Sequence, residues 1–374
     1  MSGETFVRRS EVRMEGVGKR YGRAWAARDI SISIRPGEFY TFLGPPGAGK
    51  TTLLKMLAGL VAADAGHIVV DDEVIDPVPA GKRNIGMVFR PYGLWPHLSV
   101  LDNAGFGLRT RGEPRDDVDR KVKAALELVG LQGVENRHPP ELSPSEQLRL
   151  ALARVLVMRP RLLLLDEPLT GLDAAESAAM RQLLSRLQRD AGITTIHATG
   201  DHADALALST RIAVLRAGSI LQEGKPQEIY WRPRSRFVAE FVGAANLIPV
   251  RVVELREVGV VVETAGGTQV PVASGGQPWT IGAQGLLCLR PEALVVEESA
   301  LAQLGIPGTV AAQSFEGSRQ LYEIDIAGGT LRVEMVTSTR YGGDFKAGDR
   351  IKVEVSPETA VLLPDPGPGP RNGL

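Results

Sequence analysis

The chain has 374 residues, with 43 Lys and Arg residues against 44 Asp and Glu residues, so its formal net charge is −1. That length exceeds one ordinary domain, and the balanced charge excludes a protein that binds nucleic acid through its overall charge. A single cysteine, Cys288, excludes an internal disulfide. The N-terminal stretch lacks the apolar core of a signal peptide, and no apolar run approaches the roughly 18 residues of a membrane span. We therefore expect a cytosolic protein that reaches any membrane through a partner.

Up to about Phe241, short apolar runs alternate with helical patterns. The apolar runs are Phe39–Leu43, Ile85–Phe89, Leu162–Leu165, Thr194–Ala198 and Arg211–Leu215. Two helices are predicted from their periodic apolar faces, Arg115–Val129 and Ala174–Arg189. Buried apolar strands separated by helices are typical of a largely parallel sheet, so this part of the chain is predicted to be an α/β domain.

A phosphate-binding pattern, GPPGAGKTT, lies between the apolar run FYTFL and the helical run LLKMLAGL. It fits GxxxxGK[ST], in which glycines let backbone N–H groups curl around phosphate oxygens at the start of a helix. Lys50 is predicted to reach the outer phosphates, and Thr51 to bind Mg²⁺. The residues predicted to bind nucleotide are Gly44, Pro45, Pro46, Gly47, Ala48, Gly49, Lys50, Thr51 and Thr52. The alternative is a glycine-rich turn with a solvated lysine, which the strand before it and the helix after it disfavour.

Two acids end the apolar run LLLLDE. Asp166 is predicted to hold Mg²⁺, and Glu167 to orient or deprotonate the attacking water, with Glu167 and Lys50 as the catalytic residues. An apolar strand that ends in acids is often only structural. The phosphate-binding pattern upstream favours the catalytic interpretation.

The last third of the chain changes to short alternating strands after the connector Arg232–Arg236. The strands are predicted in VRVVELREVGVVVET, QVPVA and LYEIDIAGGTLRVEMV. Two turns, Ala265–Thr268 and Ala327–Thr330, share the sequence AGGT and indicate two related β-units. Residues 365–374 have too few apolar side chains to pack and are predicted to be disordered.

These motifs belong to a longer series that runs along the chain. Its pieces are KRYG with Tyr21, GPPGAGKTT, VFRPYGLWPHLSVLDN, LSPSEQLRLALAR, LLLLDEP, LTGLD, ATGDHADAL, and then FVGAANL and LRPEAL. In this order they resemble the ATP-binding subunits of ABC transporters, of the importer type with a C-terminal TOBE domain, as in maltose, spermidine and iron(III) uptake systems. The resemblance covers nearly the whole chain. It implies an α/β P-loop NTPase domain with a mostly parallel sheet and a helical subdomain, followed by a small all-β OB-like TOBE domain.

The resemblance also implies domain limits and partners. The ATP-binding domain would span residues 1–236, with its helical subdomain at about 90–157, and the β-rich regulatory domain would span 237–364. ATP and Mg²⁺ are the implied cofactors. Transmembrane permease subunits, docked on the helical region between about Arg90 and Pro140, and a solute-binding protein are the implied partners, on the cytoplasmic face of the membrane. Two nucleotide domains enclose two ATP molecules in this family, so a homodimer or a pair with a second ATP-binding subunit is expected.

Three further residues acquire a role from the resemblance. Tyr21 would stack on adenine, Ser143 of one subunit would face the γ-phosphate bound by the other, and Asp173 would bind nucleotide from the loop after the two acids. Tyr21 alone would more often be a surface or packing aromatic. Asp173 with Glu176 also has the form of a helix capping box, which is compatible with the first role.

The family's glutamine that contacts Mg²⁺ and the attacking water is Arg90 in this chain. A guanidinium has no lone pair for a metal, but it can donate hydrogen bonds to the γ-phosphate. The alternative is an Arg90 that turns outward and does nothing. A second departure is LSPSE in place of the family's LSGGQ. Pro144 removes an N–H, Ser145 adds a Cβ and Glu146 adds a negative charge, so contact with the partner's ATP is expected to be weaker.

A third departure is Gly200, which replaces the family's histidine at the γ-phosphate. His197 lies on an apparent strand, where odd spacing points it to the opposite face, so it is predicted to be a packed histidine. His202 would replace the lost side chain only through a shifted loop. Loss of one transition-state contact costs roughly 2.7–4 kcal/mol, so turnover is predicted to be low. Two functions stay open: an importer ATPase with slow hydrolysis, and a nucleotide-binding pseudo-ATPase that clamps a partner without efficient hydrolysis.

Overall fold

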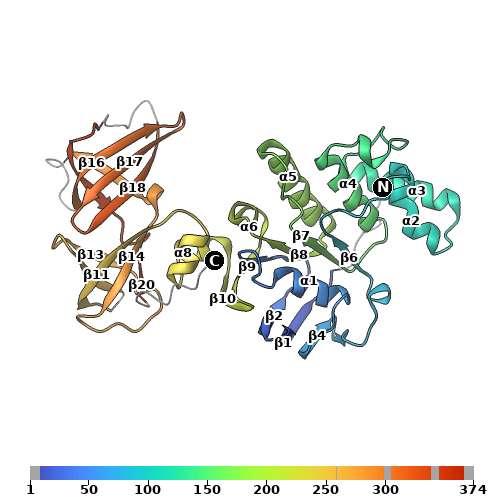
Figure 1. The fold of residues 1–374 in the computed structure, drawn as a ribbon, viewed down its shortest axis with the longest axis horizontal. Coiled ribbons are helices and arrows are strands. Elements are labelled where there is room, and N and C mark those ends of the chain that lie inside the picture. Colours follow the sequence, from blue (N-terminus) through green and yellow to red (C-terminus); the bar gives the residue numbers. More distant parts are fainter. Residues whose placement is uncertain (1–8, 258, 299–304, 338–344, 366–374) are drawn as a thin grey trace. The chain divides into compact units, whose positions relative to one another are not determined.

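The computed structural model describes residues 9–257, 259–298, 305–337 and 345–365. The chain folds into two compact units, Met1–Pro226 and Gln227–Leu374 (Figure 1). Among the described helices, none is long and apolar enough to cross a membrane. From position 366 onward, the tail that is predicted to be disordered lies outside the described residues.

The first unit is built on a six-stranded sheet of the order β10-β9-β3-β8-β7-β6. The strands are β3 (Phe39–Leu43), β6 (Ile85–Val88), β7 (Leu162–Asp166), β8 (Thr194–Thr199), β9 (Arg211–Arg216) and β10 (Ser219–Gly224). All neighbours pair in parallel except β10, which is antiparallel to β9. Every residue of β3, β7 and β8 is buried, as in a sheet covered on both faces. The predicted α/β fold with a mostly parallel sheet is therefore confirmed.

A second sheet of the first unit is antiparallel and is absent from the predicted elements. Its order is β2-β1-β4-β5, with β1 (Val12–Tyr21), β2 (Ala24–Ile34), β4 (Ala65–Val70) and β5 (Glu73–Val74). The pairing of β1 with β2 shifts register between Met14 and Val17 and again before Lys19. Its apolar residues therefore do not keep the strict period of two that marks a strand in a sequence. This sheet places Tyr21 at the end of β1.

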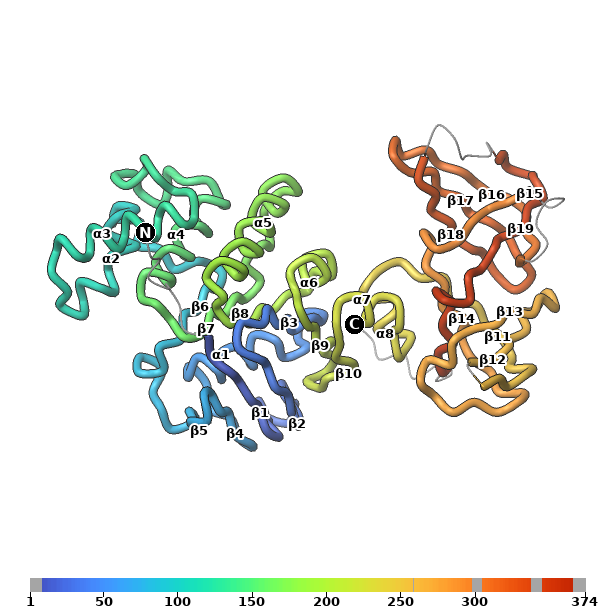
Figure 2. The backbone as a smooth tube through the Cα atoms, turned by 180° about the vertical axis from the view of Figure 1, so that it is seen from behind, coloured from blue at the N-terminus to red at the C-terminus, as the bar shows by residue number. Residues whose placement is uncertain are grey.

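Helices cover the main sheet and form a separate group beyond its β6 edge. They are α1 (Lys50–Ala58), α2 (Val100–Thr110), α3 (Arg115–Val129), α4 (Pro144–Leu156), α5 (Ala174–Ala191) and α6 (His202–Leu208), with 3-10 turns at Ala80–Lys82 and Pro139–Glu141. Helices α2, α3 and α4 pack on one another (Figure 2). Helix α3 has its predicted bounds, because Gly130 ends it in the left-handed conformation with a φ of 72°.

The second unit joins two short helices to two five-stranded antiparallel sheets. The sheet orders are β13-β12-β11-β14-β20 and β15-β19-β16-β17-β18. The elements are α7 (Pro226–Trp231), α8 (Arg236–Phe241), β11 (Asn246–Leu255), β12 (Val260–Thr264), β13 (Gln269–Val272), β14 (Gln284–Leu289), a 3-10 turn (Pro291–Ala293), β15 (Leu294–Glu298), β16 (Ile306–Phe315), β17 (Arg319–Ile326), β18 (Gly329–Val336), β19 (Arg350–Val355) and β20 (Val361–Pro364). An all-β fold after an α/β unit agrees with the predicted fold class.

The two AGGT turns of the second unit lie against each other. Ala265–Thr268 joins β12 to β13, and Ala327–Thr330 leads from β17 into β18. A Cβ on Gly266 would lie only 3.1 Å from the Cβ of Ala327. Glycine allows the two backbones to approach this closely, so the repeated sequence marks a contact between the two sheets.

Arg290, next to the end of β14, ties α7 and α8 to the sheets of the second unit. Its side chain is buried, and its guanidinium lies 4.1 Å from the centre of the Tyr230 ring. At distances of 2.8 to 3.2 Å the guanidinium donates to the carbonyl oxygens of Tyr230, Ala239, Gly243 and Ala244. These contacts explain why the second unit begins after Pro226, earlier than the predicted boundary at Arg236.

Replacement of Arg290 by Met should lower the free energy of unfolding of the second unit by about 2–4 kcal/mol. The methionine fills much of the same volume, but the buried carbonyl groups lose their charged donor. Chemical denaturation of the full chain, followed by tryptophan fluorescence, measures the change. Arg251→Met, at an exposed arginine of β11, is the matched control, and equal stability of the two variants would contradict the role of Arg290.

Candidate functional site

The phosphate-binding pattern forms the turn between β3 and α1, and two of its positions require glycine. Gly49 precedes α1 with a φ of 102°, and a Cβ there would lie 1.9 Å from the carbonyl oxygen of Ala26. A Cβ on Gly44 would lie 2.5 Å from the carbonyl oxygen of Leu215. Helix α1, which the structure describes in full, has no acid in its first turn, so its positive end is not neutralised locally. The turn is therefore shaped to receive an anion.

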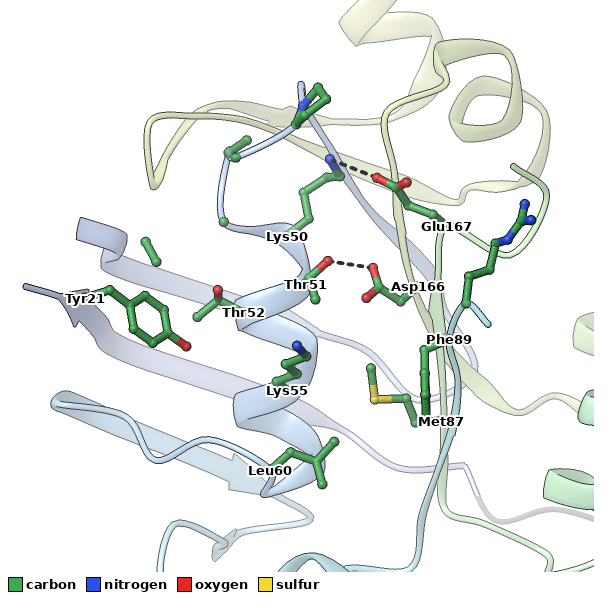
Figure 3. A pocket seen from close by; sticks show the side chains of 16 residues that line it. Tyr21, Lys50, Thr51, Thr52, Lys55, Leu60, Met87, Phe89, Asp166 and Glu167 are labelled. Carbon is green, nitrogen blue, oxygen red and sulfur yellow. Dashed lines mark hydrogen bonds and ion pairs between the residues drawn. The ribbon is translucent and has the colours of Figure 1, made fainter. Parts of the chain in front are cut away.

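Lys50, the first residue of α1, turns its side chain back toward this turn and is 4% exposed. Its Nζ donates to the carbonyl oxygens of Gly44 and Pro45 at 2.7 and 3.2 Å. The same atom lies 3.4 Å from Oε1 of Glu167 (Figure 3). A buried ammonium group needs such partners, and a bound anion can take the place of the carboxylate.

Asp166, the last residue of β7, faces Thr51 of α1. Thr51 Oγ1 donates to Asp166 Oδ1 at 2.9 Å (Figure 3). Burial raises the pKa of Asp166, the hydrogen bond from Thr51 opposes that rise, and the charge of Glu167 adds to it. A hydroxyl and a carboxylate are hard oxygen donors of the kind that Mg²⁺ prefers. Within the described residues no three His, Cys, Asp or Glu side chains form a metal site, so a cation here would need further oxygens from nucleotide and water.

Glu167 leaves β7 in an uncommon backbone conformation. Its φ is 47°, in the left-handed region, and its N–H donates to the carbonyl oxygen of Ala198 in β8 at 2.8 Å. The side chain points toward Lys50 and is 40% exposed. A backbone held in this region beside a reactive group is a sign of a functional role, and the exposure gives the carboxylate access to water.

These side chains line one cavity of about 670 Å³. The lining residues are Tyr21, Ala26, Pro46–Thr52, Lys55, Leu60, Met87, Phe89, Arg90, Asp166 and Glu167. Tyr21 is 53% exposed, so its ring is available for stacking. Gly44 and Pro45 lie outside this set and contribute the carbonyl oxygens that hold Lys50. The structure thus brings most of the predicted site residues to one cavity.

Sequence reasoning misses part of the cavity wall, namely Ala26, Lys55, Leu60, Met87 and Phe89. Lys55 stands four positions after Thr51 on α1, so helical periodicity could have placed it on the same face. Met87 and Phe89 lie close to Arg90 in the chain, a proximity that could have found them. Ala26 carries no such signal, because it belongs to the antiparallel sheet that the sequence pattern does not predict.

Two predicted binding residues, Ser143 and Asp173, do not line the cavity of their own chain. Each precedes a helix as its N-cap. Ser143 Oγ accepts from the N–H of Glu146 at 3.2 Å, and Asp173 Oδ1 accepts from the N–H of Glu176 at 2.8 Å. In both cases the glutamate accepts a hydrogen bond from the N–H of the cap residue. Both are capping boxes, so a nucleotide contact would have to reach the cavity of another subunit.

The start of α4 is occupied by its own carboxylate. Pro144 has no N–H to donate, and Ser145 Oγ lies 3.1 Å from Ser143 Oγ. Glu146 accepts the N–H of Ser143 at 2.8 Å and lies 3.7 Å from Nη1 of Arg137. A carboxylate at a helix start stabilises the helix, but it takes the place that an external anion would use.

Gly200 follows β8 and lies close to the phosphate-binding turn. A Cβ there would lie 3.5 Å from the carbonyl oxygen of Gly44, which is an ordinary contact distance. His197 is fully buried in β8, with Nδ1 3.2 Å from Oγ1 of Thr41, as expected for a packed histidine. His202 is the exposed first residue of α6 and does not line the cavity. Neither histidine takes the position of the side chain that Gly200 lacks.

The sequence matches two family descriptions, "ABC transporter" over residues 27–170 and "TOBE domain" over residues 287–363. The Fe(3+) ions import ATP-binding protein FbpC of Brucella abortus (strain 2308) is 38% identical over 327 residues, which cover 87% of this chain and 91% of that protein. The spermidine/putrescine import ATP-binding protein PotA of Methylococcus capsulatus is 38% identical over 350 residues, which cover 93% and 91%. The chain belongs to the ATP-binding subunits of ABC importers.

Two solved structures resemble this ABC subunit over part of its length. The dimeric structure of MJ0796, a bacterial ABC transporter cassette, has a TM-score of 0.53 and 28% identity, and covers 57% of this chain and 98% of that one. The structure of cbiO1 from Clostridium perfringens, part of the ABC transporter complex cbiONQ, has a TM-score of 0.56 and 30% identity, and covers 62% and 92%. MJ0796 has also been solved in a post-hydrolysis state bound to ADP and Pi. As a member of this family, the chain is an ATP hydrolase of the ABC transporter type.

His197 makes the stability of the ABC subunit depend on pH. Burial lowers its pKa from 6.5 to about 3, so below pH 6.5 the unfolded chain binds a proton that the folded chain does not. Stability from this group is complete above pH 6.5 and falls as the pH drops, by about 2 kcal/mol at pH 5. His197→Gln should flatten this dependence in denaturation curves at pH 7 and pH 5. His202→Gln is the exposed control, and identical slopes for both variants would contradict the assignment.

Gly200→His should raise the turnover of Mg-ATP by about tenfold or more, because an imidazole would add a transition-state contact that is worth up to about 10²–10³ in rate. The other departures limit the gain, since residues that act as a unit do not contribute additively. Steady-state phosphate release at saturating ATP measures it. Gly200→Ala introduces the same Cβ without the imidazole, so an equal gain in both variants would show that the histidine ring is not the cause.

Proposed function

We propose that this ABC subunit binds Mg-ATP in the cavity between α1 and β7 and hydrolyses it slowly to drive solute import. The observation that carries the proposal is the convergence of two pairs of side chains. Thr51 and Asp166 form a hydrogen bond of 2.9 Å, and Lys50 and Glu167 form an ion pair of 3.4 Å. Lys50 binds the outer phosphates, the turn before it wraps their oxygens, and Tyr21 stacks on the adenine.

Glu167 acts as the base that orients and deprotonates the attacking water. Its carboxylate lies 3.4 Å from Lys50, and a phosphate that takes over the ammonium group leaves the carboxylate free to accept from water. The Glu167 side chain is 40% exposed, so water can reach its carboxylate. Lys50 meanwhile stabilises negative charge on the phosphate as the bond to the leaving group breaks.

The hydroxyl of Thr51 and the carboxylate of Asp166 fit a magnesium ion. Mg²⁺ held by these two side chains would supply positive charge that offsets the negative charge on the phosphates during transfer. Because burial raises the pKa of Asp166, a falling pH protonates this ligand sooner than it would an exposed aspartate. The carboxylate form that holds the metal is therefore lost at a higher pH.

Slow hydrolysis follows from the three departures. Arg90 cannot ligate Mg²⁺, the start of α4 keeps its own carboxylate, and Gly200 offers no side chain to the γ-phosphate. The first departure removes a metal ligand, and the other two remove or weaken an interaction at the transferred phosphate. Glu167 argues against a fully inactive site, because a subunit that only binds nucleotide has no need of a base.

The working assembly contains further subunits. A second ATP-binding subunit, identical or not, completes the site, because Ser143 and Asp173 lie outside the cavity of their own chain. Permease subunits dock on the helical region between about Arg90 and Pro140. The chain then lies on the cytoplasmic face of the membrane, and a solute-binding protein delivers the solute.

The transported solute is not chosen by sequence identity. FbpC and PotA are equally similar to this chain, at 38% identity, so identity does not decide between Fe(3+) and spermidine or putrescine.

Mg-ATP turnover and ATP affinity of the purified chain, alone and with its membrane partners, test this function. Lys50→Ala should weaken ATP binding by about tenfold or more, because a charged donor to phosphate is lost. Glu167→Gln should keep the ATP affinity while turnover falls about 10²–10⁴-fold. Asp190→Asn removes one exposed carboxylate of α5, outside the helical region that docks the permease subunits, and as the control should change neither quantity.

Two results would contradict the proposal in different ways. An unchanged ATP affinity in Lys50→Ala would remove the nucleotide site itself. Tight ATP binding without turnover that depends on Glu167, alone and with partners, would leave a subunit that clamps a partner without efficient hydrolysis.

A further inference from the structure

Arg90 is a cation of the cavity wall that has no part in the hydrolysis steps above. It lies just after β6 and lines the same cavity as Lys50 and Glu167. In the sheet, β8 and β7 separate β6 from β3, the strand that leads into the phosphate-binding turn. Glu167 follows β7, so Arg90 enters the cavity from the far side of Glu167 relative to Lys50.

The guanidinium of Arg90 rests against the turn that follows Glu167. A Cβ on Gly171 would lie 2.8 Å from Nη1 and 3.2 Å from Nη2 of Arg90. Gly171 has a φ of 80°, in the left-handed region that favours glycine. The guanidinium has room there because position 171 has no side chain. The ring of Tyr92, with its centre 5.9 Å from Cζ, is a second neighbour.

Among the described residues, no oxygen accepts a hydrogen bond from the guanidinium N–H groups of Arg90. Both acids of the cavity have other partners, since Asp166 accepts from Thr51 and Glu167 pairs with Lys50. A guanidinium offers five N–H donors in one plane and no lone pair to a metal. It fits two oxygens of a phosphate at once, so the chemistry of Arg90 selects an oxyanion.

We propose that Arg90 binds the terminal phosphate of a nucleoside triphosphate directly, and that this contact makes the cavity prefer triphosphate over diphosphate without a divalent metal. The inference rests on the proposed function, because it needs a nucleotide whose inner phosphates lie on the phosphate-binding turn. Lys50 binds the phosphates that lie at its own end of the cavity. Only a group that extends past Glu167 reaches Arg90, and in a nucleoside triphosphate that group is the terminal phosphate.

Calorimetric titration of the full chain with ATP and with ADP, in buffer that contains EDTA, tests the inference. The quantity of interest is the ratio of the two dissociation constants. Arg90→Gln should reduce the preference for ATP by about 10- to 100-fold, as expected for loss of charge-assisted hydrogen bonds, and should leave ADP affinity nearly unchanged. Arg189→Gln, an exposed arginine near the end of α5, removes the same charge elsewhere and should keep the wild-type ratio.

A second variant tests whether the position of the guanidinium matters, while Arg90 itself is kept. Gly171→Ala puts a Cβ 2.8 Å from Nη1 of Arg90, which is closer than a carbon contact allows, so it should displace the guanidinium and also reduce the preference for ATP. Thermal unfolding of this variant is measured in parallel, because alanine is strained at this φ. If Gly171→Ala does not fold, Arg90→Gln alone decides.

The outcomes separate this inference from the proposed function. If wild-type chain binds ATP and ADP equally in EDTA, or if Arg90→Gln keeps the wild-type ratio, the role of Arg90 is wrong. Lys50→Ala is titrated in the same series. Weakened binding in Lys50→Ala with an unchanged ratio in Arg90→Gln removes only the inference, whereas unchanged binding in Lys50→Ala removes both proposals.

Discussion

Strands β3 and β7 run in parallel on either side of β8, and this arrangement brings the reactive side chains together. Parallel strands end at the same edge of a sheet, so the turn after β3 and the acids after β7 meet there. The hydrogen bond between Thr51 and Asp166 and the ion pair between Lys50 and Glu167 then join segments that are far apart in the sequence. Because the strands are buried on both faces, the sheet holds these groups in a fixed geometry.

Two charges that depart from the family pattern have opposite structural outcomes. Arg90 and Glu146 stand where the family has neutral glutamines. The carboxylate of Glu146 has partners at the start of its helix, because it accepts a hydrogen bond from the N–H of Ser143 and lies near the guanidinium of Arg137. Arg90 instead keeps its donors and lies in the cavity wall. One substitution that weakens the family motif therefore caps a helix, and the other places a cation in the wall of the cavity.

The second unit depends on polar contacts with the backbone as well as on its apolar core. Arg290 donates to carbonyl oxygens of the chain around α7 and α8, and the hydrogen bonds of Asn246 with the backbone of Arg332 link β11 to β18. Buried polar groups of this kind are costly unless every partner is present, so they specify one arrangement of the elements. This explains why the unit includes the helices before its first strand.

The sequence by itself determined the parallel sheet, the bounds of α3, the phosphate-binding turn and the two acids, because these follow from local periodicity and from residue types that few other structures need. Only the tertiary structure decided the antiparallel sheet with its bulges, the membership of Lys55 and Phe89 in the cavity, and the start of the second unit before Arg236. It also decided that Arg90 faces the cavity and lies against Gly171. The physical reason is that register shifts, charge partners and the packing of one backbone on another join residues that are distant in the chain, and no local pattern records them.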